Sequence, residues 1–263
     1  MKKAMIHDKQ LLQRRFSRHL RSYDTSAVVQ RTIADRIGGL LEQRYANGGR
    51  VRCGVEIGAG TGFLTRHLVR LFPEAEWTAN DLTAESGNWL PGSVRFEAGD
   101  GEQFAFPDGA CDLIASASVV QWFDDLPGFI ARAAKGLRSQ GGVLALGTFG
   151  PENLREITGT TGRGLHYYPL ESLRKEVERN GLRIAVAEEW IERQLHPTPA
   201  DVLRHLRLTG VNGVAAERWT RDRLRRFEAD YRSAYTLPAP SGSDGEEGVT
   251  LTFHPIILIA ERD

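Results

Sequence analysis

A glycine-rich turn, Gly58-Ala59-Gly60-Thr61-Gly62, constrains the fold of this chain more than any other feature. An apolar segment over residues 51–57 precedes it, and a helical pattern over residues 63–72 follows it. Glycines are needed in such a turn because a Cβ atom would hold a ligand away from the backbone amides. The dinucleotide pattern G-x-G-x-x-G would require its third glycine at position 63, which is Phe63. The turn therefore predicts a cofactor site after a buried strand and disfavours a nicotinamide dehydrogenase.

Short apolar segments alternate with helical patterns around this turn. Such alternation is typical of β-α-β units on a parallel sheet, so we expect an α/β protein. Strands are expected at residues 51–57, 75–82, 94–98, 111–116 and 143–149, and helices at 63–72 and 126–137. After residue 150 we expect helices at 170–180, 200–208 and 220–235, strands at 182–191 and 249–259, and a turn over 237–248.

The N-terminal part of the chain has apolar residues three and four positions apart over residues 9–45. This spacing predicts two amphipathic helices. Residues 23–26, Tyr-Asp-Thr-Ser, are expected between them, where they would cap the second helix.

Acidic residues follow the expected strands at positions where a nucleoside could be bound. Asp81, at the end of the second strand, could accept hydrogen bonds from ribose hydroxyls, and Leu82 beside it could pack on a purine. Asp100, in Gly99-Asp100-Gly101 after the third strand, could accept from an adenine amine. Glu56, just before the glycines, would repel a diphosphate and favour a sulfonium or an amino group.

The pattern Glu56-x-Gly58-x-Gly60-x-Gly62, with Asp81 and Asp100, resembles the class I S-adenosylmethionine-dependent methyltransferases over residues 50–150. The resemblance implies a mostly parallel, Rossmann-like seven-stranded sheet of order 3-2-1-4-5-7-6, with an antiparallel last strand, helices on both faces and a helical lid. It implies S-adenosylmethionine as cofactor, S-adenosylhomocysteine as product and no metal. The implied cofactor-binding residues are Tyr23, Glu56, Gly58, Ala59, Gly60, Asp81, Leu82, Asp100, Gly101 and Ser116.

Four further segments resemble the malonyl-acyl-carrier-protein O-methyltransferases of biotin synthesis: residues 16–27, 117–123, 147–154 and 251–255. The resemblance implies methyl transfer to the free carboxyl of malonyl-acyl-carrier protein or malonyl-coenzyme A, giving an ester that primes pimeloyl synthesis. Gln121-Trp122 is shared with small-acid methyltransferases, so an enzyme for a free acid such as trans-aconitate is the alternative. A binding module without an acceptor site is a further possibility.

Methylation of a carboxylate requires no general base, because carboxyl groups are ionised at neutral pH. A cation or hydrogen-bond donor is expected to face the free carboxylate of the malonyl group, and the candidates after the fifth strand are Arg155, Arg163, His166, Tyr167 and Tyr168. Arg155 and His166 are preferred among them. Tyr23 is expected to fold over the methionine moiety or the reacting methyl group, as the resemblance implies. Gln121, Trp122 and Tyr167 are expected to line the substrate pocket, whereas His254 is expected to be a satisfied core histidine.

The 34 basic and 34 acidic side chains balance, so no global field attracts nucleic acid or a membrane. Cys53 and Cys111 are too few for a disulfide framework, and no signal peptide or membrane span is recognised, which favours the cytoplasm. The resemblance implies an acidic carrier protein, which would dock on basic helices. The candidate basic residues are Arg14, Arg15, Arg18 and Arg21 near the N-terminus, and Arg218, Arg221, Arg223, Arg225 and Arg226 in the lid.

The chain is expected to divide near residue 46. Residues 1–46 would be a helical extension that covers the cofactor, and residues 47–263 the methyltransferase domain. A helical insertion is expected at about residues 196–236.

Overall fold

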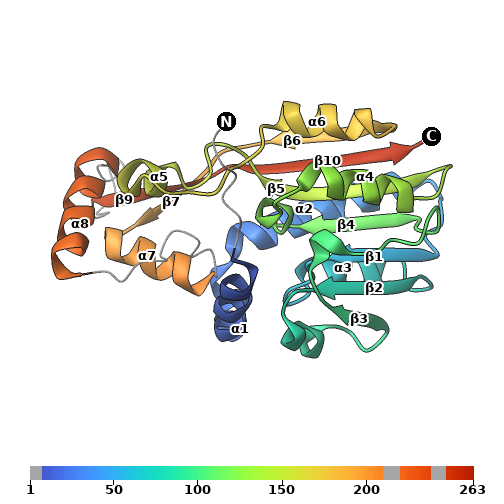
Figure 1. Cartoon of the computed structure of the whole chain (residues 1–263), viewed down its shortest axis with the longest axis horizontal. Helices are drawn as coiled ribbons and strands as arrows, with labels where there is room; N and C mark the ends of the chain where they lie inside the picture. Colours follow the sequence, from blue (N-terminus) through green and yellow to red (C-terminus); the bar gives the residue numbers. More distant parts are fainter. Residues whose placement is uncertain (1–7, 210–219, 238–246) are drawn as a thin grey trace.

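The computed structural model describes residues 8–209, 220–237 and 247–263, and its centre is a seven-stranded sheet. The strand order is β3-β2-β1-β4-β5-β10-β6, and only β10 runs antiparallel to its neighbours (Figure 1). This order and direction confirm the prediction. The strands are β1 (Cys53–Ile57), β2 (Glu76–Asp81), β3 (Val94–Ala98), β4 (Leu113–Ala117), β5 (Gly142–Phe149), β6 (Leu182–Glu189) and β10 (Pro255–Arg262).

The strand order reverses between β1 and β4, which pair in parallel with Glu56 opposite Ala115. The chain leaves β1 toward β2 on one side and returns to β4 on the other. Ligands of open α/β sheets bind at such a switch point, outside the carboxyl ends of the strands. The topology thus places the site at the end of β1, where the glycine turn begins.

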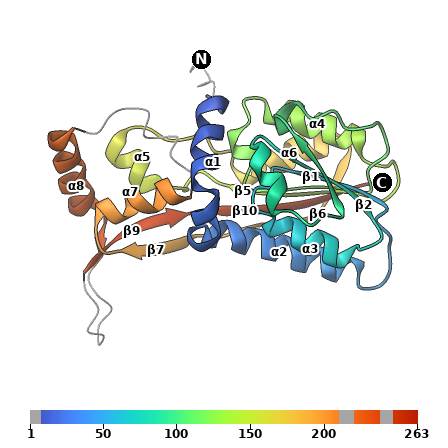
Figure 2. The same ribbon diagram turned by 90° about the horizontal axis from the view of Figure 1, so that it is seen from below.

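Helices cover both faces of the sheet (Figure 2). Helices α2 and α3 lie on one face, and α4 and α6 lie on the other. Because both faces are covered, every residue of β5 is buried, as is typical of central strands in such folds. The covering helices are α2 (Val28–Tyr45), α3 (Phe63–Leu71), α4 (Leu126–Gly136) and α6 (Leu170–Arg179).

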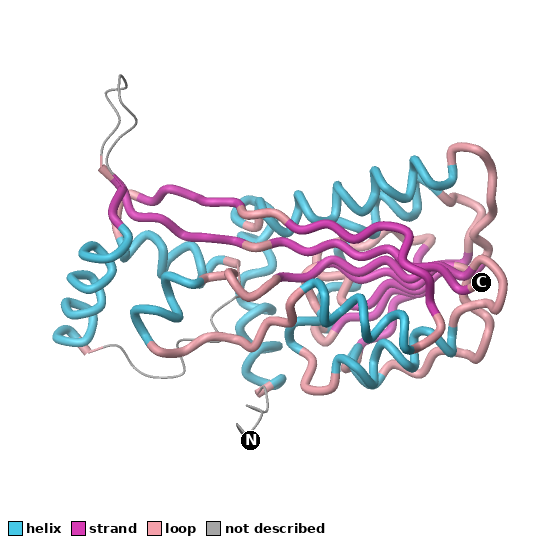
Figure 3. Tube along the Cα trace, turned by 90° about the horizontal axis from the view of Figure 1, so that it is seen from above, coloured by secondary structure: helices cyan, strands magenta, loops and turns pink. Residues whose placement is uncertain are grey.

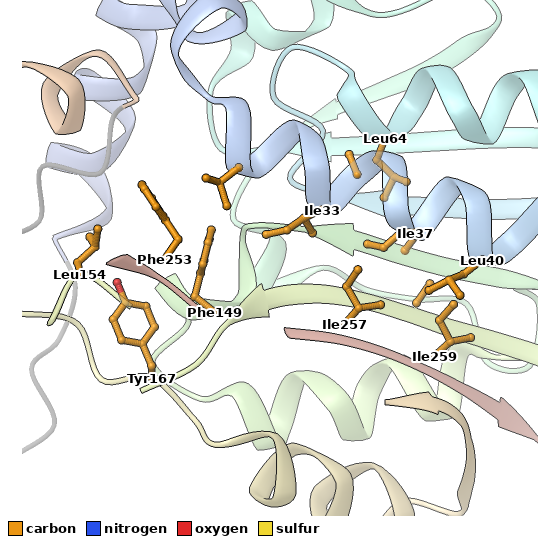
Figure 4. Packing of buried hydrophobic residues seen from close by; sticks show 14 of the residues in the cluster. Ile33, Ile37, Leu40, Leu64, Phe149, Leu154, Tyr167, Phe253, Ile257 and Ile259 are labelled. Carbon is orange, nitrogen blue, oxygen red and sulfur yellow. The ribbon is translucent and has the colours of Figure 1, made fainter. Parts of the chain in front are cut away.

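Helix α2 approaches the sheet closely over Gly147 of β5. A Cβ atom at Gly147 would lie 2.4 Å from Ile33 and 2.9 Å from Ile37, so only glycine fits there. Ile33 and Ile37 share one buried cluster with Ile257 and Ile259 of β10 (Figure 4). Helix α2 is therefore part of the core, and a division of the chain at residue 46 stays a prediction.

The boundary between the first two helices differs from the prediction. Helix α1 (Lys9–Ser26) includes residues 23–26, and α2 begins after Ala27, which has no side-chain cap. The prediction that these residues cap α2 was wrong, because fully buried Ala27 makes the turn and its N–H donates to the carbonyl of Tyr23. Tyr23 is thereby held on α1, which crosses the edge of the sheet (Figure 2).

A second sheet of three strands, order β7-β9-β8, extends the molecule beyond the first. The sequence predicted one strand over 249–259, whereas the structure has β9 and β10, separated by His254. Figure 3 shows the two strands following one another from the small sheet into the large one. The additional elements are β7 (Glu192–His196), β8 (Thr236–Leu237), β9 (Gly248–Phe253), α5 (Arg155–Thr161), α7 (Pro199–Leu208) and α8 (Arg221–Tyr235).

His254 is buried and bonded, as the sequence predicted. Its Nδ1 accepts from the N–H of Glu152 at 3.2 Å, and its Nε2 lies 3.1 Å from Oε2 of Glu189. Within the described ranges, no helix is long and apolar enough to cross a bilayer.

Candidate active site

The glycine turn follows β1 with three glycines in left-handed conformations: Gly58 (φ 74°), Gly60 (φ 56°) and Gly62 (φ 84°). The N–H groups of Gly58 and Ala59 donate to the carbonyl of Asn80 at 2.8 and 2.9 Å. A Cβ atom at Gly58 would lie 2.1 Å from Val119, so the approach of the loop after β4 also requires glycine.

Asp81 shapes the turn from the end of β2. Its Oδ2 accepts from the N–H of Gly60 at 2.8 Å, and its Oδ1 accepts from the N–H of Thr83 at 2.8 Å. Burial raises the pKa of Asp81 above its ordinary value, although the bonds from Thr83 and Gly60 oppose the shift. Each carboxylate oxygen can accept a further hydrogen bond, which fits a ribose diol.

Glu56 is buried at the end of β1 and accepts from Oγ1 of Thr65 at 2.6 Å. Burial raises its pKa to about 7, and the charge of Asp81 adds to the shift. A cationic group near Glu56 would favour the ionised carboxylate.

Asp100 lies at the end of β3 and is bonded to α1. Its Oδ1 accepts from the N–H of Glu102 at 3.1 Å, and its Oδ2 lies 2.7 Å from Nζ of Lys9. Lys9 also pairs with the buried carboxylate of Glu102 and lies 5.9 Å from the ring centre of Phe123. Burial opposes its charge, but the two carboxylates outweigh burial and raise the pKa of Lys9. The sequence did not indicate Lys9 as a site residue.

These groups line one cleft of about 930 Å³, partly open to solvent, which we call the main cleft. Helix α1 forms the wall opposite the glycine turn, and Phe16 would lie 3.5 Å from a Cβ atom at Gly60. The main cleft contains nine of the predicted cofactor residues: Tyr23, Glu56, Gly58, Ala59, Gly60, Asp81, Leu82, Asp100 and Gly101.

Ser116, the remaining predicted cofactor residue, lies outside the main cleft. It is fully buried in β4, and its hydroxyl donates to the carbonyl of Ile57 at 2.9 Å. The Ser116 hydroxyl therefore bonds β4 to β1. Ser118, two residues later, lines the cleft instead, in a left-handed conformation with φ 62°.

A second hollow of about 500 Å³, which we call the side cavity, adjoins the main cleft. The predicted pocket residues Gln121, Trp122 and Tyr167 line it, together with Asn153 and Thr209. Phe149 and Phe253 form part of its wall, 6.4 Å apart, and Figure 4 shows them near Tyr167. The two hollows share Leu12, Phe16, Tyr23, Gln30, Ser118 and Trp122.

Tyr23 lies at this shared wall. Its ring packs edge-on to Phe16, with centroids 5.1 Å apart, and stacks on Phe63 at 5.6 Å. Burial raises the pKa of Tyr23, and the charges of Asp81 and Asp24 add to the shift, so the hydroxyl stays protonated.

Arg155 and His166, the preferred substrate ligands, line neither hollow. Helix α5 begins at Arg155, directly after buried Leu154. The Arg155 side chain is 43% exposed and pairs with Glu152 at 3.1 Å. The ring of His166 packs on Tyr168, with centroids 5.2 Å apart. Neither residue lines the side cavity, and a role of Arg155 or His166 toward the substrate stays a prediction.

Comparison with known proteins identifies the family. A methyltransferase domain model matches residues 55–145. A malonyl-acyl-carrier-protein O-methyltransferase of Porphyromonas gingivalis is 38% identical over 97% of this chain and 96% of that protein. A Haemophilus influenzae protein of the same name is 36% identical over 96% of this chain and 94% of that protein. This chain belongs to the malonyl-acyl-carrier-protein O-methyltransferase family.

Solved structures agree with this fold. A Bacillus halodurans protein described as a putative methyltransferase has a TM-score of 0.61 and 15% identity, covering 86% of this chain and 98% of that one. The chain is a class I, S-adenosylmethionine-dependent O-methyltransferase, as the glycine motif predicted. The described part of this methyltransferase contains no group of three or more His, Cys, Asp or Glu side chains able to hold a metal.

Proposed function

We propose that this methyltransferase converts the free carboxyl of malonyl-acyl-carrier protein into its methyl ester. The observation that supports the proposal best is the shared wall between the main cleft and the side cavity. A cofactor in the first and an acyl group in the second would meet at Tyr23 and Ser118. The acceptor is inferred from the names of the relatives, which do not favour the trans-aconitate alternative.

S-adenosylmethionine, when bound, would supply a methyl group on a sulfonium: an oxygen of the ionised carboxylate would bond to the methyl carbon as the carbon–sulfur bond breaks and S-adenosylhomocysteine leaves, so no proton has to be transferred. The protein then has to orient two charged groups and exclude water, because their charges cancel in the product. We assign the ribose to Asp81, the adenine amine to Asp100 and the cationic end of the cofactor to Glu56. Tyr23 covers the reacting centre from α1.

The carrier protein is proposed to dock on α1 and the helices that follow β7. Arg14, Arg18 and Arg21 are exposed on α1, and α7, which packs against α1, exposes Arg204 and Arg207. The pKa of His19 is lowered by burial and by the charges of Arg207 and Arg18, which indicates that the two helices form one positive surface. Arg221, Arg225 and Arg226 of α8 are also exposed, whereas Arg218 lies outside the described residues.

A transfer assay tests this function. Labelled S-adenosylmethionine is offered with malonyl-acyl-carrier protein, malonyl-coenzyme A or trans-aconitate, each at low and high salt. We expect carrier-bound malonate to be preferred and its advantage to shrink at high salt, because exposed charges are screened. Methylation of trans-aconitate alone would refute the proposal.

A further inference from the structure

A chain of hydrogen bonds fixes the orientation of Tyr167 at the side cavity. The backbone N–H of His254 donates to Oδ1 of Asn153 at 3.3 Å. The other end of the Asn153 amide, Nδ2, therefore donates to the hydroxyl oxygen of Tyr167 at 2.8 Å. Because the Tyr167 oxygen accepts this bond, its own hydrogen remains to be donated elsewhere.

That hydrogen has no acceptor among the residues that the structure describes, and the Tyr167 side chain lines the side cavity. Tyr167 is only 8% exposed, so solvent cannot easily replace the missing partner. Burial raises its pKa, although the bond from Asn153 opposes the shift. Tyr167 is therefore a permanent neutral donor facing the cavity.

Gln30 presents a second unused donor at the shared wall. It is 6% exposed, and it lines both the main cleft and the side cavity from the first turn of α2. Its amide makes no side-chain hydrogen bond within the described ranges. Gln121 differs, because its Nε2 already donates to the carbonyl of Ser118 at 2.7 Å and its Oε1 accepts from Thr148 at 3.2 Å.

Ser118 adds a third donor at the side cavity. Its hydroxyl is buried without a hydrogen-bond partner, and its backbone has a φ of 62°, which is unusual for a residue with a side chain. Strained residues with unpaired polar groups are concentrated at ligand sites. The strain at Ser118 holds its hydroxyl at the junction of the two hollows.

The described residues that line the side cavity include no lysine, arginine or histidine. A carboxylate placed there would still need hydrogen bonds, because an unpaired buried charge is costly. Neutral donors stabilise such a charge without cancelling it, so the carboxylate remains a nucleophile. A cation at the same place would lower that nucleophilicity.

We propose that Tyr167, Gln30 and Ser118, which line the same cavity, bind the acceptor carboxylate through neutral hydrogen bonds. This inference rests on the proposed function and replaces Arg155 and His166 as the groups that orient the acceptor. It also explains release of the product, because a methyl ester is neutral and accepts weaker hydrogen bonds than a carboxylate.

Tyr167→Phe tests the proposal, because it retains the ring and removes the hydroxyl, which is both the proposed donor and the acceptor of the bond from Asn153. We expect kcat/KM for malonyl-acyl-carrier protein to fall about 10- to 100-fold, in line with the loss of a hydrogen bond to a charged group. Affinity for S-adenosylhomocysteine, measured by calorimetry, should stay within about twofold of the wild-type value. Gln30→Met should behave in the same way. The matched controls Tyr168→Phe and exposed Gln43→Met should leave both quantities unchanged.

A binding comparison separates recognition of the carboxylate from a packing effect. Malonyl-pantetheine and its methyl ester are titrated into the complex with S-adenosylhomocysteine. We expect the wild-type enzyme to prefer the acid and Tyr167→Phe to lose most of that preference. An undiminished kcat/KM or an undiminished preference in Tyr167→Phe would overturn the proposal. If only trans-aconitate is methylated, the proposed function fails, and the same variants decide the role of Tyr167 with that acid.

Discussion

The ammonium of Lys9 lies 2.7 Å from Oδ2 of Asp100, so the first turn of α1 is bonded to the end of β3. Gln13 adds a second link, because its Nε2 donates to the carbonyl of Leu82 at 2.8 Å. These two bonds hold α1 across the place where we assign the adenosine. We therefore expect α1 to restrain the exchange of the cofactor.

Lys9→Met should accelerate that exchange. Loss of a partly buried ion pair is expected to raise the dissociation rate of S-adenosylhomocysteine about threefold to fivefold. Stopped-flow fluorescence measures the rate, and hydrogen exchange of the α1 amides should increase in parallel. Arg14→Met, at an exposed position on the same helix, is the control. Equal dissociation rates for the two variants would show that the Lys9 pair does not restrain α1.

Asp81→Asn should weaken binding of S-adenosylhomocysteine about 10- to 100-fold, because charge-assisted bonds to the ribose are lost. The bonds from Gly60 and Thr83 to the Asp81 carboxylate would weaken as well, since an amide has only one oxygen to accept them. Calorimetry measures the affinity. An unchanged affinity would be incompatible with the ribose assignment.

Glu56 should make the stability of the ligand-free enzyme pH-dependent. Its pKa is about 7 in the folded chain against an ordinary value of 4.5, so the folded state binds more protons between these values. The contribution of Glu56 to the free energy of unfolding is therefore fully present below about pH 4.5 and is lost as the pH rises through 7. Glu56→Gln should raise the free energy of unfolding at pH 8 by on the order of 3 kcal/mol. Urea unfolding at pH 4 and pH 8 measures this difference, which should nearly vanish at pH 4.

The affinity for S-adenosylhomocysteine should depend on pH in the opposite direction from the stability. The amino group of S-adenosylhomocysteine is a cation, which favours ionised Glu56. Wild-type affinity should therefore fall as the pH is lowered from 8 to 6, with proton release on binding near pH 7. Glu56→Gln should bind more weakly at pH 8 and lose most of this pH dependence. Calorimetry in buffers of different ionisation enthalpy gives both quantities, and a parallel pH dependence in the variant would contradict the role of Glu56.

Gly58→Ala should destabilise the protein more than Gly109→Ala. Both glycines have positive φ, 74° and 63°, so both substitutions strain the backbone. Only at Gly58 does the added Cβ atom collide with a neighbour, Val119 at 2.1 Å, whereas nothing lies within 4 Å at Gly109. Overpacking should add about 1–3 kcal/mol to the free energy of unfolding that is lost at Gly58. Thermal unfolding compares the two variants, and similar losses of stability would mean that the loop at Val119 can shift at little cost.

Arg18→Glu should reduce kcat/KM for malonyl-acyl-carrier protein several-fold at low salt, because like charges slow the encounter. Turnover of malonyl-pantetheine, which has no carrier protein, should be unchanged. Lys175→Glu on α6, which covers the sheet away from α1, is the matched control (Figure 1). If both variants lose activity equally, the positive surface on α1 is not where the carrier docks.

The main cleft was largely predictable because its residues follow strands within short, local patterns. A glycine turn after a buried segment places Glu56, Gly58 and Asp81 together, whatever the rest of the chain does. Ser116 was expected among these residues but does not line the main cleft, because its hydroxyl bonds β4 to β1, which the sequence does not show. Lys9 was missed because its partners are more than ninety residues away in the sequence.

The side cavity was predictable only in part. Tyr167 was expected there, but its hydrogen-bond chain depends on His254, which interrupts an apolar segment that otherwise reads as one strand. Arg155 was expected there because arginines bind carboxylates, whereas in the structure it is partly exposed and pairs with Glu152. The positions of these side chains depend on packing between residues that are far apart in the sequence. The local spacing of apolar residues does not show that packing.

The interruption at His254 has a consequence for engineering. β9 belongs to the small sheet and β10 to the large one, yet they are separated by a single residue that also holds Asn153 in place. The residues around the side cavity therefore cannot be exchanged as a unit that is separate from the large sheet. A chimera that exchanges only α7 and α8 with a relative would leave the hydrogen bonds from His254 to Asn153 and from Asn153 to Tyr167 in place. To exchange those bonds as well, the graft must include residues 150–168 and the last two strands together.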